Sequence, residues 1–300
     1  MEKLIAGEEN KYIRKLINLI CNFISNFKVN GYNATEFESM KNSTSNVRTK
    51  LFIEICENCY LEYERWLKEN HAVDFEDMIN ESARLLREVK QMKQKLDFKY
   101  IIIDEYQDIS KQRFDLIKAL SDVKDAKIIA VGDDWQSIYA FSGSDISLFT
   151  KFKEKMGYAK LLKIVNTYRN SQDVIDIAGN FIQKNTEQIT KRLISSKRII
   201  NPVVIYTYDS TSKVVNQNRR SGANYSMAHA IEIALSQLIE YKKQEGKQPG
   251  TIFLLGRYSF DGDRLEKSGL FEYIKKGSRI KSVKYPKLDI TFMTVHSSKG

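Results

Sequence analysis

The stretch YIIIDEYQD, residues Tyr100–Asp108, decides how the rest of this 300-residue chain can fold. Its first four residues are an apolar, largely β-branched run, which is typical of a strand buried on both faces of a parallel sheet. The run ends abruptly in two carboxylates, Asp104 and Glu105. Because ligands of open α/β sheets bind beyond the carboxyl ends of the strands, the stretch predicts an α/β fold with its chemistry at this strand end.

The two carboxylates have separate possible roles. Asp104 is a candidate ligand for Mg²⁺, a hard cation that prefers oxygen ligands and phosphate company. Glu105 is a candidate base for a water molecule. The alternative interpretation is a strand that simply ends in solvated acids. A second apolar run, Lys127–Val131, leads into GDDWQSIYAFSGSD at residues Gly132–Asp145, so two strand ends carry polar groups.

The composition restricts the class of protein and its partners. The formal net charge is +10, from 48 Lys and Arg against 38 Asp and Glu. This excess suits a polyanion, although many lysine-rich proteins are basic for solubility alone. No apolar run approaches the roughly 20 residues that cross a bilayer, and the first nine residues lack a signal-peptide pattern. We therefore expect a cytoplasmic protein without a membrane partner, and the three cysteines fit a reducing compartment.

The length suggests two domains, at roughly 150 residues each. The pattern divides the chain into a helical part at 1–98, a strand-rich part at 99–159, and a renewed strand–helix alternation at 160–300. In the first part we expect a loop at 31–46 and a helix at 47–69. The apolar side chains expected on the inner face of that helix are Leu51, Ile55, Cys59 and Trp66. Further strands are expected at 161–165, 202–208, 251–257 and 289–295.

Several of these segments resemble one family. Asp-Glu-x-Gln-Asp after an apolar strand is similar to motif II, the Walker B element, of the UvrD/Rep-type superfamily 1 helicases. Residues Gly132–Asp145 resemble motif III, and the Asp-Trp-Gln-Ser variant is nearest to the helicase IV branch. The segments resembling motifs IV, IVa and V are Asn166–Ser171, Thr251–Arg257 and Met293–Gly300. Two strand-terminal motifs in the family's order are a specific signal.

The resemblance implies a fold of the P-loop NTPase (RecA-like) type. Its parallel sheets would form two partial domains, 99–159 with motifs II and III and 160–300 with motifs IV to V. Residues 1–98 would be a helical subdomain at the N-terminus. The implied activity is that of an ATP-dependent 3′–5′ DNA helicase or translocase in DNA repair, with ATP and Mg²⁺ as cofactors. The implied substrate is single-stranded DNA or DNA with a single-stranded tail.

For the nucleotide, the resemblance carries roles over position by position. It implies Asp104 as the Mg²⁺ ligand, Glu105 as the residue that orients or deprotonates water, and Gln136 as a contact of the γ-phosphate. Arg169 would be the arginine finger, and Arg257 a second phosphate contact. These groups supply much of what phosphoryl transfer needs, namely a metal, a positioned water and positive charge. Asp104 and Glu105 would then face Arg169 across a nucleotide-sized gap.

For DNA, the resemblance implies four contacts on two segments. Phe141 would stack on a base, with Tyr139 nearby, and such stacking tolerates any sequence. Thr294 and His296 would contact the DNA backbone. Outside its motif, each aromatic side chain would more often be a packing residue.

Two parts of such an enzyme are absent from this sequence. No Gly-x-x-x-x-Gly-Lys-Ser/Thr loop occurs in it, so there is no backbone cradle for the β-phosphate and no P-loop lysine. The sequence also lacks the arginine-bearing motif VI. We therefore expect an internal piece of a helicase that does not hydrolyse ATP alone. The missing helicase segments, supplied in trans, are a candidate partner. The alternative is a non-catalytic module that binds single-stranded DNA or a partner protein.

Overall fold

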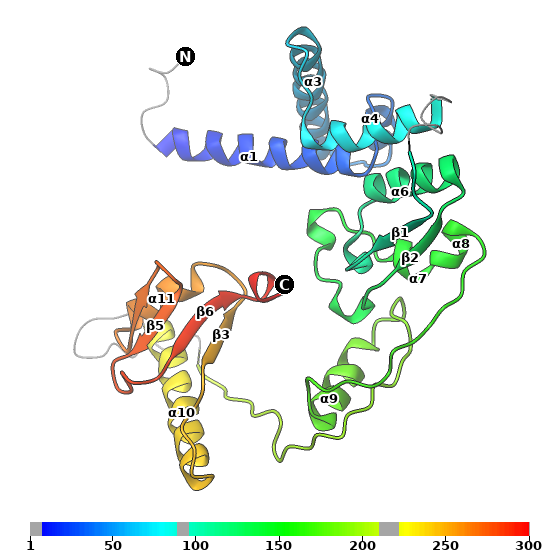
Figure 1. Ribbon diagram of the computed structural model, residues 1–300. Helices are drawn as coiled ribbons and strands as arrows, with labels where there is room; N and C mark the ends of the chain where they lie inside the picture. The colour runs from blue at the N-terminus through cyan, green and yellow to red at the C-terminus, as the bar shows by residue number, and fades with distance from the viewer. Residues whose placement is uncertain (1–7, 89–95, 210–221, 300) are drawn as a thin grey trace. The chain divides into compact units, whose positions relative to one another are not determined.

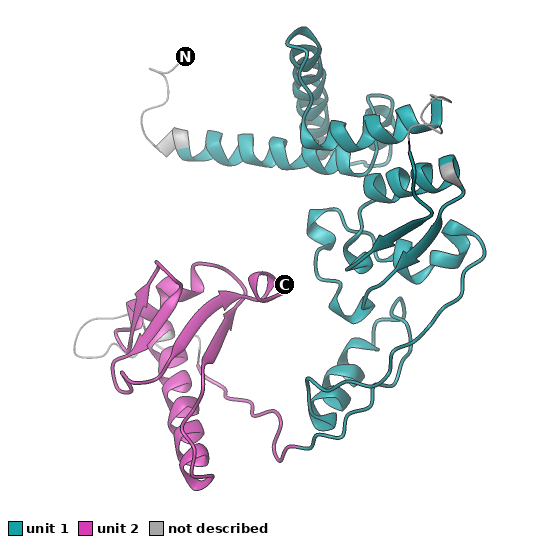
Figure 2. Cartoon of the chain, viewed as in Figure 1, with its two compact units in different colours: residues 1–198 teal, residues 199–300 magenta. Residues whose placement is uncertain are grey.

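The computed structural model describes residues 8–88, 96–209 and 222–299, and it confirms a mixed α/β fold (Figure 1). The chain forms two compact units, Met1–Arg198 and Ile199–Gly300, coloured separately in Figure 2. Residues 160–198, which the sequence assigns to the second domain, cluster with the first unit. Their assignment to the second domain stays a prediction.

Within residues 8–88, four helices form the N-terminal helical part. They are α1 (Glu8–Val29), α2 (Glu36–Asn42), α3 (Val47–Glu69) and α4 (Phe75–Glu88). The expected loop at 31–46 was wrong, because α2 lies within it. Phe37 of α2 is fully buried and stacks on Phe27 of α1 with ring centroids 4.4 Å apart. Burial of the Phe37 ring stabilises α2, a short helix that the polar residues around Phe37 do not predict.

The bounds of α3 were predicted correctly, but its inner face was not. The buried side chains of α3 are Ile53, Cys56, Tyr60 and Leu67. The side chains that the sequence placed inward are exposed instead: Leu51, Ile55, Cys59 and Trp66. The helix carries apolar residues on two faces, and packing against α1 and α2 selects one of them.

A buried cation ties three of these helices together. Lys28 of α1 is 3% exposed, and its Nζ lies 2.8 Å from Glu64 of α3. The same nitrogen lies 2.7 Å from Asp74 and 2.6 Å from Asp77, at the start of α4. Burial opposes protonation, but the three carboxylates outweigh it and raise the pKa of Lys28. Asp74 also accepts a hydrogen bond from the Asp77 backbone N–H at 2.7 Å and so begins α4.

The central sheet of the first unit pairs β1 (Tyr100–Ile103) with β2 (Lys127–Ala130) in parallel, as predicted. The helix α6 (Lys111–Lys124) connects the two strands, and α7 (Ser147–Thr150) and α8 (Phe152–Met156) follow β2. The core of this region is formed by Tyr106, Ile109, Phe114 and Leu148. The expectation of burial on both faces was wrong, because Ile102 is 71% exposed and Tyr100 and Ile129 are exposed beside it. Only one face of the described sheet is covered.

The rest of the first unit contains α9 (Gln172–Ile182) and little other regular structure. The strand expected at 161–165 was wrong: Asn166 forms a single parallel bridge with Ile194 instead. Hydrogen bonds from the Ile194 N–H to the Val165 carbonyl (2.8 Å) and from the Thr167 N–H to the Ile194 carbonyl (2.9 Å) flank this bridge. The two extended segments 165–168 and 194–197 therefore lie side by side.

The second unit is a mixed sheet packed against helices. The strands β3 (Ile252–Gly256), β4 (Phe271–Ile274), β5 (Arg279–Ser282) and β6 (Ile290–Thr294) have the order β3-β6-β5-β4. β3 and β6 are parallel, whereas β5 is antiparallel to both β4 and β6, so the expected all-parallel sheet was wrong here. The helices are α10 (Gly222–Gln244) and α11 (Asp261–Ser268). The strand expected at 202–208 is absent from this described segment.

Candidate nucleotide and DNA sites

The carboxyl end of β1 presents both predicted acids to solvent. Asp104 and Glu105 are exposed, and the Glu105 N–H donates to Asp104 Oδ1 at 2.9 Å. Glu105 has φ 50° and ψ 39°, the left-handed conformation that side chains other than glycine adopt rarely. Such a conformation persists only where its surroundings hold it, and residues of this kind are concentrated at functional sites.

Gln107 connects this strand end to the next one. Its side chain is fully buried, in the short 3₁₀ helix η2 (Tyr106–Asp108). Its Nε2 donates to Glu105 Oε2, and its Oε1 accepts from the Asp133 N–H at 2.9 Å. A Cβ at Gly132 would lie 2.5 Å from Gln107 Oε1, so this approach requires glycine. The sequence alone does not indicate this role of Gln107, because Asp133 lies 26 residues away.

The second strand end carries Gln136 in the 3₁₀ helix η3 (Asp134–Gln136). Asp133 begins this turn: its Oδ1 accepts from the Trp135 N–H at 3.2 Å and its Oδ2 from Gln136 Nε2 at 2.8 Å. Lys191 forms ion pairs with both Asp133 and Asp134. Burial acts to raise the pKa of Asp133, but the hydrogen bonds from Lys191 and Gln136 outweigh it and lower that pKa. Gln136 is exposed, and the turn that carries it is held by the ionised carboxylate of Asp133.

The acids at this edge suit a metal that needs few protein ligands. Across residues 8–88, 96–209 and 222–299, no group of three or more His, Cys, Asp or Glu side chains could hold a metal ion. Mg²⁺ usually keeps several waters and is held by one or two carboxylates together with phosphates. The exposed carboxylate of Asp104 meets this requirement of Mg²⁺. A structural zinc site needs four protein ligands, so it does not fit this edge.

The aromatic loop that follows lies beside a pocket. Tyr139 and Phe141 have ring centroids 6.1 Å apart, and Phe141, in η4 (Ala140–Ser142), is 64% exposed. Phe141 lines a cavity of about 480 Å³ together with Phe75, whose side chain is 83% exposed. The other lining residues come from α1, α4, α6 and the aromatic loop: Asn22, Ser25, Asn26, Val29, Glu76, Ile79, Gln112, Arg113 and Ser142. Phe75 has no role among the residues predicted from the sequence, although an aromatic residue in the first turn of a helix is a visible signal.

The remaining predicted residues lie on other segments. Arg169 is exposed in a bend between the Asn166 bridge and α9, within the first unit. In the second unit, Arg257 follows β3 and Thr294 ends β6, which is parallel to it. Thr294 exchanges hydrogen bonds with Ser297, in the turn η5 (His296–Ser298) that contains His296. Arg257, Thr294 and His296 therefore share one sheet edge, and their predicted roles stay predictions.

The described part of the chain contains no helix that is both long and apolar enough to cross a membrane. A parallel strand pair that ends in acids, with a glutamine turn beside them, places polar groups where open α/β sheets bind their ligands. The chain belongs to the UvrD/REP helicase family, because residues 1–157 match that family's N-terminal domain. This confirms the family that the motifs predicted.

Individual relatives agree with the family. The chain is 31% identical over 236 residues to "DNA helicase IV" of Escherichia coli, covering 78% of this chain and 29% of that protein. It is 31% identical over 227 residues to "ATP-dependent DNA helicase PcrA" of Staphylococcus epidermidis, covering 72% of this chain and 31% of the relative. For "Putative ATP-dependent DNA helicase YjcD" of Bacillus subtilis, 33% identity extends over 153 residues, half of this chain and 20% of the relative. The chain thus spans less than a third of each relative's length.

Proposed function

We propose that this chain forms part of an ATP-dependent DNA helicase or translocase that moves 3′ to 5′ on single-stranded DNA. The observation that carries the proposal is the connected polar edge of the parallel pair β1–β2. Gln107 links Glu105 to the backbone of Asp133, and Asp133 in turn holds Gln136. Groups that would contact metal, water and phosphate are therefore held on one hydrogen-bonded frame.

In this proposal each polar group has one role. Asp104 binds Mg²⁺, which when bound neutralises charge on the transferring phosphoryl group. Glu105 orients the attacking water and accepts its proton, and its fixed left-handed backbone holds the carboxylate at the strand end. Gln136 contacts the γ-phosphate, and Arg169 and Arg257 add positive charge.

The DNA contact is proposed for the pocket between Phe75 and Phe141. Both rings are exposed, and the pocket between them has room for a nucleobase. Asn22, Asn26 and Arg113 add polar and basic groups to its lining, which suits a base and its phosphate. Tyr139 supports this surface, and Thr294 and His296 are proposed to contact the DNA backbone from the second unit.

Further helicase segments are proposed to cover the open face of the β1–β2 sheet, within one polypeptide or in trans. Four apolar side chains are exposed on these strands and directly after β2: Tyr100, Ile102, Ile129 and Val131. Exposed apolar patches usually mark an interaction surface. We propose that such a segment also supplies the missing phosphate loop and that the chain alone does not hydrolyse ATP.

A second candidate function is a non-catalytic module that binds single-stranded DNA or a partner protein. The Phe75–Phe141 pocket favours it, because the pocket lies within the first unit and requires no phosphate loop. Both functions predict DNA binding, and they differ in whether a nucleotide changes it.

Titrating the 300-residue chain with a fluorescently labelled oligonucleotide tests the proposal. We expect single-stranded DNA to bind more tightly than duplex, with an affinity that falls as salt rises, because phosphate contacts release counterions. The chain alone should release no phosphate from ATP. Once a segment bearing the Gly-Lys-Ser/Thr loop is added, Mg²⁺-ATP should change the DNA affinity and phosphate should be released.

The outcomes separate the two functions. Single-strand binding without any response to the added segment and nucleotide would support the binding module and reject the motor. Binding that does not depend on salt or strandedness would reject both.

Changing Phe75 or Phe141 to alanine should weaken single-strand binding by roughly 5–150-fold each, since stacking on a base contributes about 1–3 kcal/mol. Tyr158, an exposed aromatic residue that does not line the pocket, is the matched control, and its change to alanine should leave the affinity unchanged. The measurement is fluorescence anisotropy at fixed salt. Equal affinities for all three variants would exclude this pocket as the DNA site.

A further inference from the structure

Lys191 is a largely buried cation that the proposed mechanism does not use. It lies after α9, and its side chain is 13% exposed. Its Nζ forms ion pairs with Asp133 and, at 2.7 Å, with Asp134, and it lies 4.8 Å from the centre of the Trp135 ring. One cation therefore contacts the three consecutive residues that precede Gln136.

Two further contacts bring the same part of the chain onto this turn. The Ile189 N–H donates to Asp134 Oδ2 at 2.6 Å. Gly179 of α9 packs so closely on Trp135 that a Cβ there would lie 2.9 Å from the indole ring. Asp134 is only 1% exposed, so Lys191 and the Ile189 N–H contact its carboxylate in place of water.

The segment that contains Lys191 also supports Arg169. Residues 194–197 lie beside 165–168 through the Asn166–Ile194 bridge, and Lys197 Nζ donates to the Tyr168 carbonyl. Arg169 is the next residue along the chain. Lys191 thus lies three residues before Ile194, whose bridge to Asn166 holds the segment that leads to Arg169.

On its other side, Lys191 acts on Gln136 through one carboxylate. Asp133 Oδ1 accepts the Lys191 ammonium, and Asp133 Oδ2 accepts Gln136 Nε2 at 2.8 Å. Removing the cation would leave the adjacent carboxylates Asp133 and Asp134 facing each other's charge in a partly buried site. Asp133 would then favour protonation or movement, and either change would disturb its bond to Gln136.

We propose that Lys191 is a positioning residue: it anchors the segment bearing Arg169 to the turn bearing Gln136, so that one ion-pair cluster sets the place of both side chains. The role of this anchor rests on the proposed function, because that function assigns both Gln136 and Arg169 to the γ-phosphate. The contacts of Lys191 do not depend on that function, and all of them lie within the first unit.

The test uses the 300-residue chain and requires neither nucleotide nor DNA. Trp66→Phe leaves Trp135 as the single tryptophan, because the sequence contains two. Lys191→Met removes the cation, Lys191→Arg retains it, and Lys184→Met is the control on an exposed lysine seven residues earlier. Trp135 emission is followed from neutral to acid pH, with circular dichroism at neutral pH to confirm folding.

The groups that face Asp133 are Lys191, Asp134, Gln136 and the Trp135 N–H. The pKa of Asp133 is lowered in the parent chain, so its ionised contacts are lost only as pH falls through that low value. In Lys191→Met, we expect the acid transition of Trp135 emission to move up by about 1–3 pH units. Lys191→Arg and Lys184→Met should retain the parent transition. Asp133→Asn and Asp134→Asn identify which carboxyl group titrates.

A second readout reports Gln136 directly. With ¹⁵N-labelled glutamine, the side-chain amide signals of Gln136 are identified by their loss in Gln136→Leu. We expect these signals to shift in Lys191→Met, to return in Lys191→Arg and to stay in place in Lys184→Met. An unchanged Gln136 amide or an unchanged acid transition in folded Lys191→Met would overturn the proposal. A failure of DNA binding would reject the proposed function without altering either readout.

Discussion

Replacing Lys28 with methionine is expected to lower the free energy of unfolding of the N-terminal helices by about 3–5 kcal/mol. Lys28 is the cation shared by Glu64, Asp74 and Asp77, at 2.6–2.8 Å from each. Methionine keeps much of the length of lysine but no charge, so three carboxylates would remain close together without a cation. They would have to take up protons or separate, and separation would part α1, α3 and α4.

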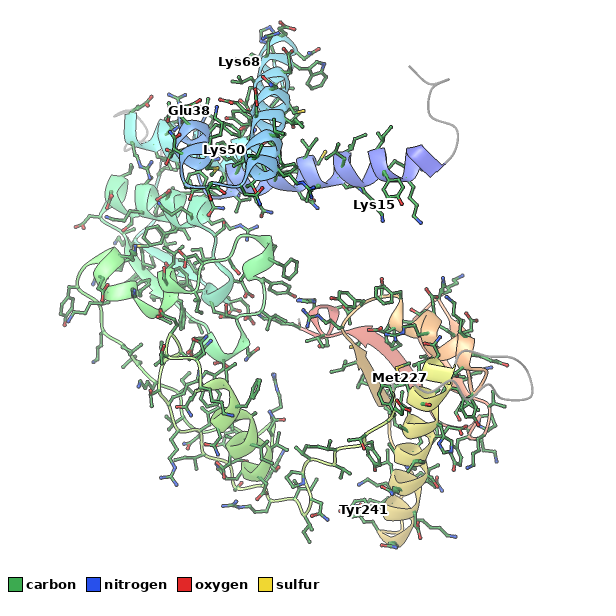
Figure 3. All side chains as sticks on the ribbon, turned by 180° about the vertical axis from the view of Figure 1, so that it is seen from behind. Lys15, Glu38, Lys50, Lys68, Met227 and Tyr241 are labelled. Atoms are coloured by element: carbon green, nitrogen blue, oxygen red, sulfur yellow. The ribbon has the colours of Figure 1, made fainter. Side chains whose placement is uncertain are left out.

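Hydrogen exchange measured by mass spectrometry locates this loss. Peptides from α1, α3 and α4 should exchange faster in Lys28→Met, whereas peptides from the second unit serve as an internal reference. Lys50→Met is the matched control, because Lys50 is an exposed lysine on α3 (Figure 3). We expect it to change stability by less than about 0.5 kcal/mol. Equal protection in the two variants would show that the cluster does not hold these helices together.

The sequence predicted the two strand ends because their signal is local. In each, a short apolar run changes within one residue to acids or to Gly-Asp, and the parallel pairing of β1 and β2 confirms the strands. The burial of those strands could not be predicted in the same way. An apolar run does not reveal whether neighbouring strands and helices are present, and Ile102 is exposed where they are not.

Errors elsewhere have the same origin, since partners distant in sequence decide between local alternatives. α3 carries two apolar faces, and contacts with Phe27 and Phe37 bury Tyr60 rather than Trp66. The segment 161–165 has the composition of a strand. This segment forms no strand, because a strand needs a neighbour along its length. The chain is bridged only at the next residue, Asn166. The strand propensity of a segment is a local property, whereas packing against neighbours determines whether the segment forms a strand.

The residues of the candidate site differ in the same way, according to whether their partners are near or distant in sequence. Asp104, Glu105 and Gln136 could be proposed from the sequence because their motifs are continuous in it. Gln107 and Lys191 were not assigned roles, because their partners lie 26 and 58 residues away. Side chains that hold a site together are often recognisable only after the fold brings their partners close.

In the chain supplemented with a segment that carries the phosphate loop, Glu105→Gln should lower ATP turnover by about 10²–10⁴-fold, the usual contribution of a general base. The substitution removes the basic carboxylate but keeps an oxygen that can accept from Gln107 Nε2. The strand end should therefore keep its shape, including the left-handed backbone at residue 105.

Two measurements separate a catalytic role for Glu105 from a structural one. Phosphate release at saturating ATP and DNA should fall, while the affinity for a fluorescent ATP analogue should stay within a few-fold of the parent. Glu154→Gln, at an exposed glutamate of α8, should change neither quantity. Loss of nucleotide binding together with turnover would indicate that Glu105 supports the site instead of activating water. Unchanged turnover would remove it from the mechanism, because a carboxylate that serves as base cannot be replaced by a neutral amide without loss of rate.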